Sequence, residues 1–276
     1  MPDGCLISQH HNIYRLSNTV ELLKDATTRK NELNHAMLYG GIIYDEENDP
    51  VVVAHGKRGA IIGIEYLPGT EEEVRSIGGE LAGSDYNVTI VTGNDATEMS
   101  VKELSGNGVS VLHLATHGFY NPIEADAQVP GADDPLIHSG LYMAGASGTV
   151  TGYAVKTADE DGILTAKDIA GLDFSDTDLV VLSACQTALG KVSDEGVFGL
   201  QRGFKKAGVN SLLMSLWPVD DEATRILMTR FYHNLAGGMD KHEALRESQS
   251  YLRLVDDGYF DDPEYWAAFI LLDAVR

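Results

Sequence analysis

DLVVLSACQT, at residues 178–187, is the stretch that decides the fold of this chain. Residues 178–182 (DLVVL) form a strand-like apolar run, and residues 183–187 (SACQT) end it in a turn of small and polar residues that carries a thiol. In open α/β sheets, ligands and catalytic groups gather at the carboxyl ends of the parallel strands. Cys185 therefore lies where a nucleophile is expected.

A second strand-like run, residues 109–115 (VSVLHLA), ends in Thr116-His117-Gly118. Alternate residues of a strand point to the same side, so His113 and His117 could both face one site. His113 is expected to pack under the sheet. His117, at the strand tip before a glycine, is the better candidate for a base, and two strand tips then offer a base and a nucleophile.

Two other interpretations of Cys185 compete with a catalytic one. A lone buried cysteine is most often a small hydrophobic side chain, but the polar neighbours and the helix start near residues 195–197 favour a thiolate. Cys185 could also bind zinc with His113 and His117. The sequence offers no fourth Cys or His at a metal-like spacing, so we expect no metal and no cofactor.

The composition limits the partners of the chain. Its 276 residues are 43% hydrophobic, which is ample for a core, and its formal net charge is −22. Binding to a phosphate backbone relies on Lys and Arg, so nucleic acid is disfavoured, as is an anionic membrane surface. An acidic surface weakly favours cationic partners.

The cysteine content and the termini indicate the compartment. The two cysteines, Cys5 and Cys185, cannot build a disulfide framework. No apolar run reaches the roughly eighteen residues of a membrane helix, and the N-terminus lacks the pattern of a signal peptide. These features predict a cytoplasmic protein.

The chain alternates between strand and helix patterns, which predicts an α/β fold with a mostly parallel central sheet. Gly40 and Gly41 interrupt the strand-like residues 36–44 and indicate a bulge or a close backbone approach. Residues 67–70 (LPGT) are expected to open a helix with Thr70 as its cap. Residues 210–217 form another strand pattern, and long helices are expected from Asp220 to about residue 235 and over residues 240–254.

Nine blocks of sequence follow one another along the chain: HLATHG (113–118), SGL (139–141), DGILTAKDI (161–169), DLVVLSACQT (178–187), EGVFGLQRGF (195–204), AGVNSLLMSLWPVDDEAT (207–224), FYHNL (231–235), EALR (243–246) and YWAAFILLD (265–273). Together, in this order, they resemble the CHAT domain, a family similar to caspases and separase. The resemblance covers residues 36–276. Residues 1–35 are then an N-terminal lead-in or the edge of a longer chain.

The resemblance implies a caspase-like α/β/α sandwich with His117 and Cys185 as the catalytic dyad. It assigns the oxyanion hole to the backbone N–H groups of Gly118 and Cys185. It also implies that the strand ending at Trp217 pairs with an extended substrate by β-addition.

Asp220 and Asp221 stand where separase-like relatives carry an acid that binds a basic P1 side chain. A carboxylate pairing with Arg or Lys would be the physical reason for that preference. The alternative is structural, because Asp220 is well placed to cap the long helix and Asp221 to interact with its dipole.

The resulting hypothesis is a cysteine endopeptidase that cleaves a specific protein partner in bacterial signalling or defence. The alternative is a catalytically silent caspase-like interaction module; an acyl or thiol transferase with the same dyad is a third possibility. Many relatives carry tetratricopeptide repeats before the domain, and this sequence lacks them. An activating partner or upstream sensor is therefore expected, of unassigned identity.

Overall fold

The apolar runs of the sequence form a six-stranded sheet in a computed structural model that describes residues 13–17, 34–45, 63–120, 134–151, 160–183 and 196–273. The strand order is β2-β1-β3-β7-β8-β9. Neighbouring strands are parallel except β9, which runs antiparallel to β8. The strands are β1 (His35–Ile42), β2 (Asn87–Gly93), β3 (Val111–Leu114), β7 (Leu179–Leu182), β8 (Ser211–Ser215) and β9 (Phe269–Leu272). The predicted mostly parallel sheet is confirmed.

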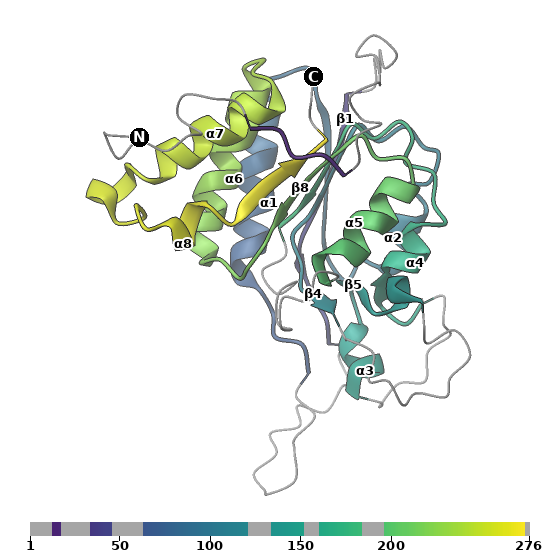
Figure 1. Ribbon diagram of the computed structural model, residues 1–276. Coiled ribbons are helices and arrows are strands. Elements are labelled where there is room, and N and C mark those ends of the chain that lie inside the picture. Colours follow the sequence, from purple (N-terminus) through teal and green to yellow (C-terminus); the bar gives the residue numbers. More distant parts are fainter. Residues whose placement is uncertain are drawn as a thin grey trace, which may run out of the picture.

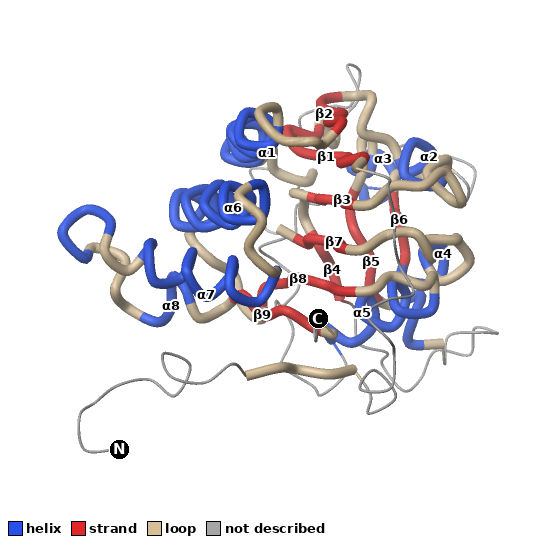
Figure 2. The backbone as a smooth tube through the Cα atoms, turned by 90° about the horizontal axis from the view of Figure 1, so that it is seen from above, coloured by secondary structure: helices blue, strands red, loops and turns tan. Residues whose placement is uncertain are grey.

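Both faces of this sheet are buried, because successive side chains of each central strand enter opposite cores. In β3, Val111 packs on one face and Leu112 on the other. The first face is covered by α1 (Pro68–Leu81), α6 (Asp221–Ala236), α7 (Lys241–Leu252) and α8 (Pro263–Trp266), with the 3₁₀ turn η5 (Val255–Gly258) between the last two. The second face is covered by α2 (Glu98–Lys102), α4 (Ala166–Ile169) and α5 (Gly196–Lys206). Figures 1 and 2 show the two helical layers on either side of the strands.

A smaller antiparallel sheet, in the order β4-β5-β6, lies at one end of the main sheet (Figure 1). Its first strand follows β3 after a short turn. The elements of this region are β4 (Gly118–Tyr120), η4 (Pro135–Ile137), β5 (Ser139–Tyr142), α3 (Ala146–Thr151) and β6 (Ile163–Thr165). The region therefore covers the carboxyl end of β3.

The start of α1 is fixed against β1 by a glycine and a threonine. At Gly40, a Cβ atom would clash with the backbone of Thr70, so only glycine permits this approach. Thr70 Oγ1 accepts a hydrogen bond from the Gly41 N–H at 2.8 Å. The expected close backbone approach is confirmed, and it brings the first turns of α1 to the carboxyl end of β1.

The prediction that Thr70 caps α1 is wrong. The helix begins at Pro68 and its cap position is Leu67, which makes no side-chain capping bond. Proline suits the first helical position because its ring fixes φ and it has no N–H to leave unpaired. Thr70 instead donates its hydroxyl to the Leu67 carbonyl at 2.7 Å inside the first turn.

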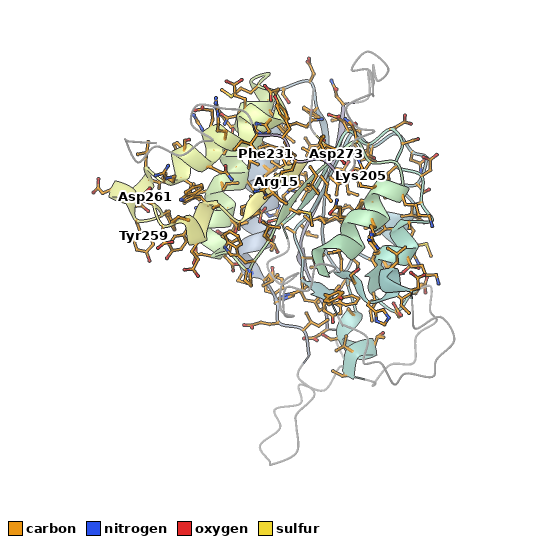
Figure 3. All side chains as sticks on the ribbon, in the orientation of Figure 1. Arg15, Lys205, Phe231, Tyr259, Asp261 and Asp273 are labelled. Carbon is orange, nitrogen blue, oxygen red and sulfur yellow. The ribbon has the colours of Figure 1, made fainter. Side chains whose placement is uncertain are left out.

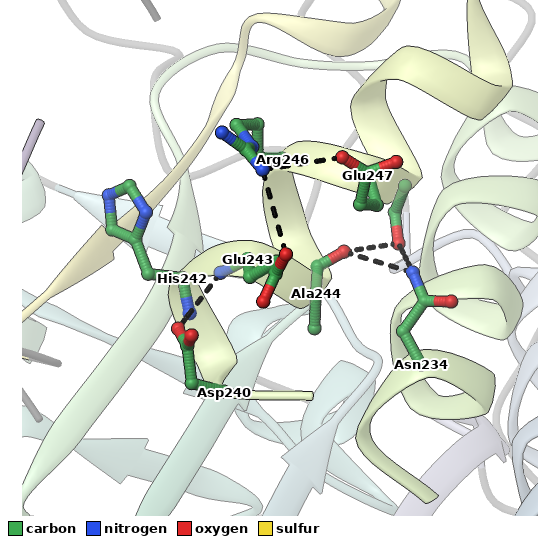
Figure 4. Close-up of polar contacts among 8 residues, drawn as sticks. Asn234, Asp240, His242, Glu243, Ala244, Arg246 and Glu247 are labelled. Atoms are coloured by element: carbon green, nitrogen blue, oxygen red, sulfur yellow. Dashed lines mark hydrogen bonds and ion pairs between the residues drawn. The ribbon is translucent and has the colours of Figure 1, made fainter. Parts of the chain in front are cut away.

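Helices α6 and α7 are joined by a buried polar contact (Figure 4). Asn234 Nδ2 on α6 donates to the Ala244 carbonyl at 3.3 Å and to Ser248 Oγ at 3.2 Å, both on α7. Asp240 caps α7 by accepting from the N–H groups of His242 and Glu243, at 3.0 Å each. These contacts fix α6, whose N-terminus lies at the candidate site.

Residues 13–17 lie beside β9 and are anchored by Asp273 (Figure 3). The Asp273 carboxylate accepts from Ser17 N at 2.7 Å and from Ser17 Oγ at 2.6 Å, and Lys205 Nζ lies 2.9 Å from it. The Asp273 N–H donates to the Arg15 carbonyl at 2.9 Å. Asp273 adopts a φ of 61°, which Asp and Asn tolerate better than most residues. One buried carboxylate thus joins the segment at residues 13–17, β9 and α5.

Asp273→Asn is expected to lower the free energy of unfolding by about 2–3 kcal/mol, because it removes the charge from a buried ion pair with hydrogen bonds. Asparagine keeps the shape and tolerates the same φ. The exposed Asp261, whose carboxylate lies 2.8 Å from Arg253 Nε, is the control, and Asp261→Asn should cost less than about 1 kcal/mol. Urea unfolding of both variants measures the difference, and equal losses would show that the Asp273 anchor has no special role.

No helix in the described segments is both long enough and apolar enough to cross a membrane.

Candidate active site

The tips of β3 and β7 lie side by side at the carboxyl end of the sheet. The two strands pair in parallel register from Val111 with Leu179 to Leu114 with Leu182. Just beyond them, the Ser183 N–H donates to the Leu114 carbonyl at 3.0 Å. The chain continues from one tip to His117 and from the other towards Cys185. Cys185 lies outside the described residues.

His117 is 6% exposed and is oriented by a backbone carbonyl. Its Nε2 lies 2.7 Å from the carbonyl oxygen of Glu65. Because a carbonyl can only accept, Nε2 carries the proton and Nδ1 of the neutral ring is left with the lone pair. The ring also packs against Tyr44, with the centroids 5.3 Å apart. His117 is thus a buried imidazole whose Nδ1 can accept a proton.

The backbone N–H of Gly118 points away from β5. His117 immediately precedes β4, and the Tyr142 N–H on β5 donates to the His117 carbonyl at 2.9 Å. Hydrogen-bonded and non-bonded pairs alternate along the antiparallel ladder of β4 and β5, so Gly118, opposite Leu141, belongs to a non-bonded pair. Its N–H group is directed out of the ladder.

A small pocket lies between the N-terminal ends of α1 and α6. Its lining includes Gly69, Thr70, Glu73, Ser183, Asp221 and Thr224. A Cβ on Gly69 would lie 3.3 Å from the Asp221 Cβ, so the glycine allows the two helix ends to approach closely. Since Ser183 is a lining residue, the pocket adjoins the carboxyl end of β7.

The adjacent acids Asp220 and Asp221 have different environments. Asp220 caps α6, and its Oδ1 accepts from the N–H groups of Glu222 and Ala223 at 3.0 Å each. Asp221 lines the pocket. The Asp221 residue is exposed, but partial desolvation beside the pocket, together with the negative charges of Asp220 and Glu73, raises its pKa, and the nearby His117 opposes this increase. The expected capping role of Asp220 is confirmed.

Glu73 lines the pocket, but the sequence gives no signal for this role. It is the third of three consecutive glutamates at a helix start, where negative charge interacts favourably with the helix dipole. The side chain is buried, and its Oε1 lies 3.1 Å from His113 Nε2. On the other side of the imidazole, His113 Nδ1 lies 3.2 Å from the Tyr232 hydroxyl. His113 is fully buried, as expected for a residue under the sheet.

His113 and His117 have different surroundings, although strand alternation suggested a shared face. The alternation does not extend to His117 because β3 ends at Leu114. His113 contacts Glu73 and Tyr232, whereas His117 contacts Glu65 and Tyr44. Among the residues that the structure describes, no group of three His, Cys, Asp or Glu side chains could hold a metal ion.

Trp217 lies just beyond β8, and its Nε1–H donates to the Glu264 carbonyl at 2.9 Å. Strand β8 is paired on both sides, with β7 and with β9. The described register with β7 ends at Leu182 and Met214, and Leu216 and Trp217 lie two and three residues further along the chain. An added strand on this side of β8 would lie beside Leu216 and Trp217.

Comparisons with known proteins agree with this architecture. The sequence model of the CHAT domain family matches residues 12–274. Tetratricopeptide repeat protein 28 of Mus musculus and of Homo sapiens are each 36% identical over 110 residues, which is 40% of this chain and only 4% of either relative.

A crystal structure of the Arg-specific cysteine proteinase gingipain R superposes with a TM-score of 0.51 at 10% identity, covering 88% of this chain and 46% of that one. At this identity the likeness concerns the fold alone. The expected caspase-like cysteine proteinase fold is confirmed.

Proposed function

The chain belongs to the CHAT domain family, and from this premise we propose that it is a cysteine endopeptidase that cleaves a specific protein partner through Cys185 and His117. The observation that carries the proposal is the pair of neighbouring strand tips. Ser183 is hydrogen-bonded to Leu114. Cys185 follows Ser183 by two residues, so chain geometry keeps its Cα within about 7 Å of the Cα of Ser183. On the other strand, His117 follows Leu114 by three residues.

In the proposed mechanism, His117 activates the thiol. Nδ1 takes the proton of the Cys185 thiol, and the thiolate attacks the carbonyl carbon of the scissile peptide bond. The Glu65 carbonyl supports this role because its hydrogen bond with Nε2 leaves Nδ1 as the basic nitrogen. The imidazolium then donates its proton to the leaving amine, and water hydrolyses the thioester to a carboxylate and the free thiol.

The oxyanion of the tetrahedral intermediate is proposed to bind the N–H groups of Gly118 and Cys185. This assignment is supported by the outward direction of the Gly118 N–H, which the β4–β5 ladder leaves unused. A preoriented backbone donor stabilises the developing charge without reorganisation during the reaction.

We propose that the substrate binds as an extended strand beside Leu216 and Trp217. These residues follow β8 at the same end of the sheet as the strand tips. Backbone hydrogen bonds would position the scissile bond, and side-chain pockets would select the sequence.

A basic P1 residue is proposed for the pocket beside Ser183. Two carboxylates line it, Asp221 and Glu73, which favours an Arg or Lys side chain through charge-assisted hydrogen bonds. Asp220, by contrast, is engaged in capping α6. Gingipain R, the similar fold, is an Arg-specific proteinase.

The biological setting is proposed to be bacterial signalling or defence, with an activating partner or upstream sensor. The similarity to a protein named for its tetratricopeptide repeats supports involvement in protein interactions. Activity assays should therefore include candidate partner proteins.

A peptide-based electrophile with Arg at P1, together with a peptide library, tests the proposed function. Wild-type protein and Cys5→Ala should be labelled once, at Cys185, and should cleave the same peptides. Cys185→Ala should do neither, because it lacks the attacking sulfur. Mass spectrometry locates the label.

Equal cleavage by the wild type and Cys185→Ala would contradict the proposal. Failure of the wild type to react or cleave, even with the candidate partner proteins added, would favour the catalytically silent interaction module.

A further inference from the structure

Tyr44 is a buried residue that lies beside His117 and follows β1. Its side chain is 2% exposed, and its hydroxyl lies 2.8 Å from Thr116 Oγ1. The Tyr44 backbone is also fixed, because its carbonyl accepts from the Ser147 N–H at 3.0 Å. Helix α3 therefore fixes the backbone of Tyr44, and the Tyr44 side chain extends to the turn between β3 and β4.

The direction of the hydrogen bonds around Tyr44 follows from counting protons. Thr116 Oγ1 donates to the Tyr142 carbonyl at 2.5 Å, because a carbonyl has no proton to give. The Tyr44 hydroxyl must then be the donor to Thr116. This leaves the Tyr44 oxygen free to accept, and the His117 N–H points to it at a longer distance of 3.4 Å.

These bonds form a closed circuit on the main chain of His117. The chain runs from the His117 N–H to Tyr44, to Thr116 and to the Tyr142 carbonyl, and the Tyr142 N–H returns to the His117 carbonyl. A trans peptide is planar, so fixing the His117 carbonyl also fixes the opposite direction of the Gly118 N–H. The same circuit of hydrogen bonds therefore fixes the directions of the His117 carbonyl and the Gly118 N–H.

We infer that Tyr44 is a positioning residue that, through Thr116, fixes the imidazole of His117 and the oxyanion-binding N–H of Gly118. The inference rests on the proposed function of His117 and Gly118. The ring of Tyr44 restricts the imidazole from the side, while the Glu65 carbonyl holds Nε2. Tyr44 itself does not contact the substrate in this arrangement.

The phenol is suited to a fixed donor role. Burial, the largest influence, raises the pKa of Tyr44 to about 12, although the hydrogen bond that its oxygen accepts from the His117 N–H opposes this. The hydroxyl therefore keeps its proton, and the direction of the circuit is the same throughout the pH range of peptide hydrolysis.

Tyr44→Phe tests the inference, with Tyr39→Phe as its matched control. Tyr39 is a fully buried tyrosine of β1 whose hydroxyl donates to the Ser100 carbonyl at 3.1 Å, away from His117. In Tyr44→Phe, kcat should fall about tenfold at unchanged KM, because small displacements of catalytic groups are costly. In Tyr39→Phe both constants should stay within about twofold of wild type, because the lost hydrogen bond does not position a group at the reaction centre.

A second readout does not require a peptide substrate. In a Cys5→Ala background, the rate of alkylation of Cys185 by iodoacetamide is measured against pH. Loosening His117 weakens its support of the thiolate, so Tyr44→Phe should move this profile to higher pH and Tyr39→Phe should not. Thr116→Val, which breaks the same circuit, should reproduce the shift and add little to Tyr44→Phe in the double variant.

The outcomes separate the two hypotheses. Coincident alkylation profiles for wild type, Tyr44→Phe and Thr116→Val would overturn the positioning role, whether or not peptides are cleaved. A shifted profile without any peptide cleavage by the wild type would support positioning and would contradict the endopeptidase. If thermal unfolding shows that Tyr44→Phe does not fold, the Thr116→Val profile alone decides.

Discussion

His117→Gln is expected to lower kcat/KM for peptide cleavage by about 10³-fold, the contribution typical of a lost acid–base group. Glutamine keeps an amide N–H that can donate to the Glu65 carbonyl, so the local backbone should survive. It has no basic nitrogen to take the thiol proton or to protonate the leaving amine. Steady-state kinetics on the best library peptide, at several pH values, measures the loss.

His233→Gln is the matched control for this substitution. The exposed His233 lies on α6, and its Nδ1 lies 2.8 Å from Glu80 Oε2. We expect its kcat/KM to stay within about twofold of wild type, because exposed ion pairs contribute little to structure or activity. A similar loss in both variants would indicate general damage to the fold, and retained activity in His117→Gln would exclude His117 as the base.

The fold could be predicted from the sequence where patterns are strong and local. The apolar runs that became β3 and β7, and the alternation of strand with helix, predict the buried parallel sheet because both faces of such strands are apolar. The long helix expected from Asp220 to about residue 235 is observed as Asp221–Ala236, with Asp220 as its cap. The start of α1 was mispredicted because Pro68 and Thr70 compete for the same boundary, and the proline takes the first helical position.

The candidate site could be predicted only where side-chain type and position both carry information. His117 stands at a strand tip before a glycine, and that pattern identifies it. The Glu65 carbonyl that orients it is a backbone group, which any residue supplies, so the sequence holds no signal for it. Tyr44 and Thr116 were missed because their contacts join segments 72 residues apart. Cys185, the residue at the centre of the sequence argument, lies outside the described residues, and its position beside His117 stays a prediction.

Glu73 illustrates how tertiary packing changes the meaning of a local pattern. In the sequence it is one of three glutamates at a helix start, and each of them suits the helix dipole. In the fold, Gly40 brings α1 against β1 and Glu73 turns inward, where it meets His113 and lines the pocket. The pocket thus carries a second acid next to Asp221, which strengthens the case for a cationic P1 side chain.

Asp221→Asn is expected to reduce kcat/KM for peptides with Arg or Lys at P1 by about 100-fold. When the bound peptide shields a carboxylate–cation pair from water, removing the carboxylate leaves the cation without its partner, which costs several kcal/mol. For peptides with a neutral P1 residue, kcat/KM should change little.

The preference for a basic P1 residue should also depend on pH. Since partial desolvation and the neighbouring acids raise the pKa of Asp221, its carboxylate becomes protonated at a higher pH than an ordinary aspartate as the solution is acidified. Preference for basic P1 should therefore weaken with falling pH in the wild type and be flat in Asp221→Asn.

Asp220→Asn distinguishes charge in the pocket from charge at the start of α6. Asparagine still caps a helix, so the stability of this variant should change by less than about 1 kcal/mol. Its P1 preference should resemble that of the wild type, because the Asp220 carboxylate accepts from the backbone N–H groups of Glu222 and Ala223.

Glu73→Gln should weaken the preference for a basic P1 residue less than Asp221→Asn does, since the Glu73 side chain is buried and contacts His113. An unchanged preference for Arg in Asp221→Asn, or cleavage by the wild type after Asp or small apolar residues, would exclude the acidic pocket as the determinant of P1 specificity.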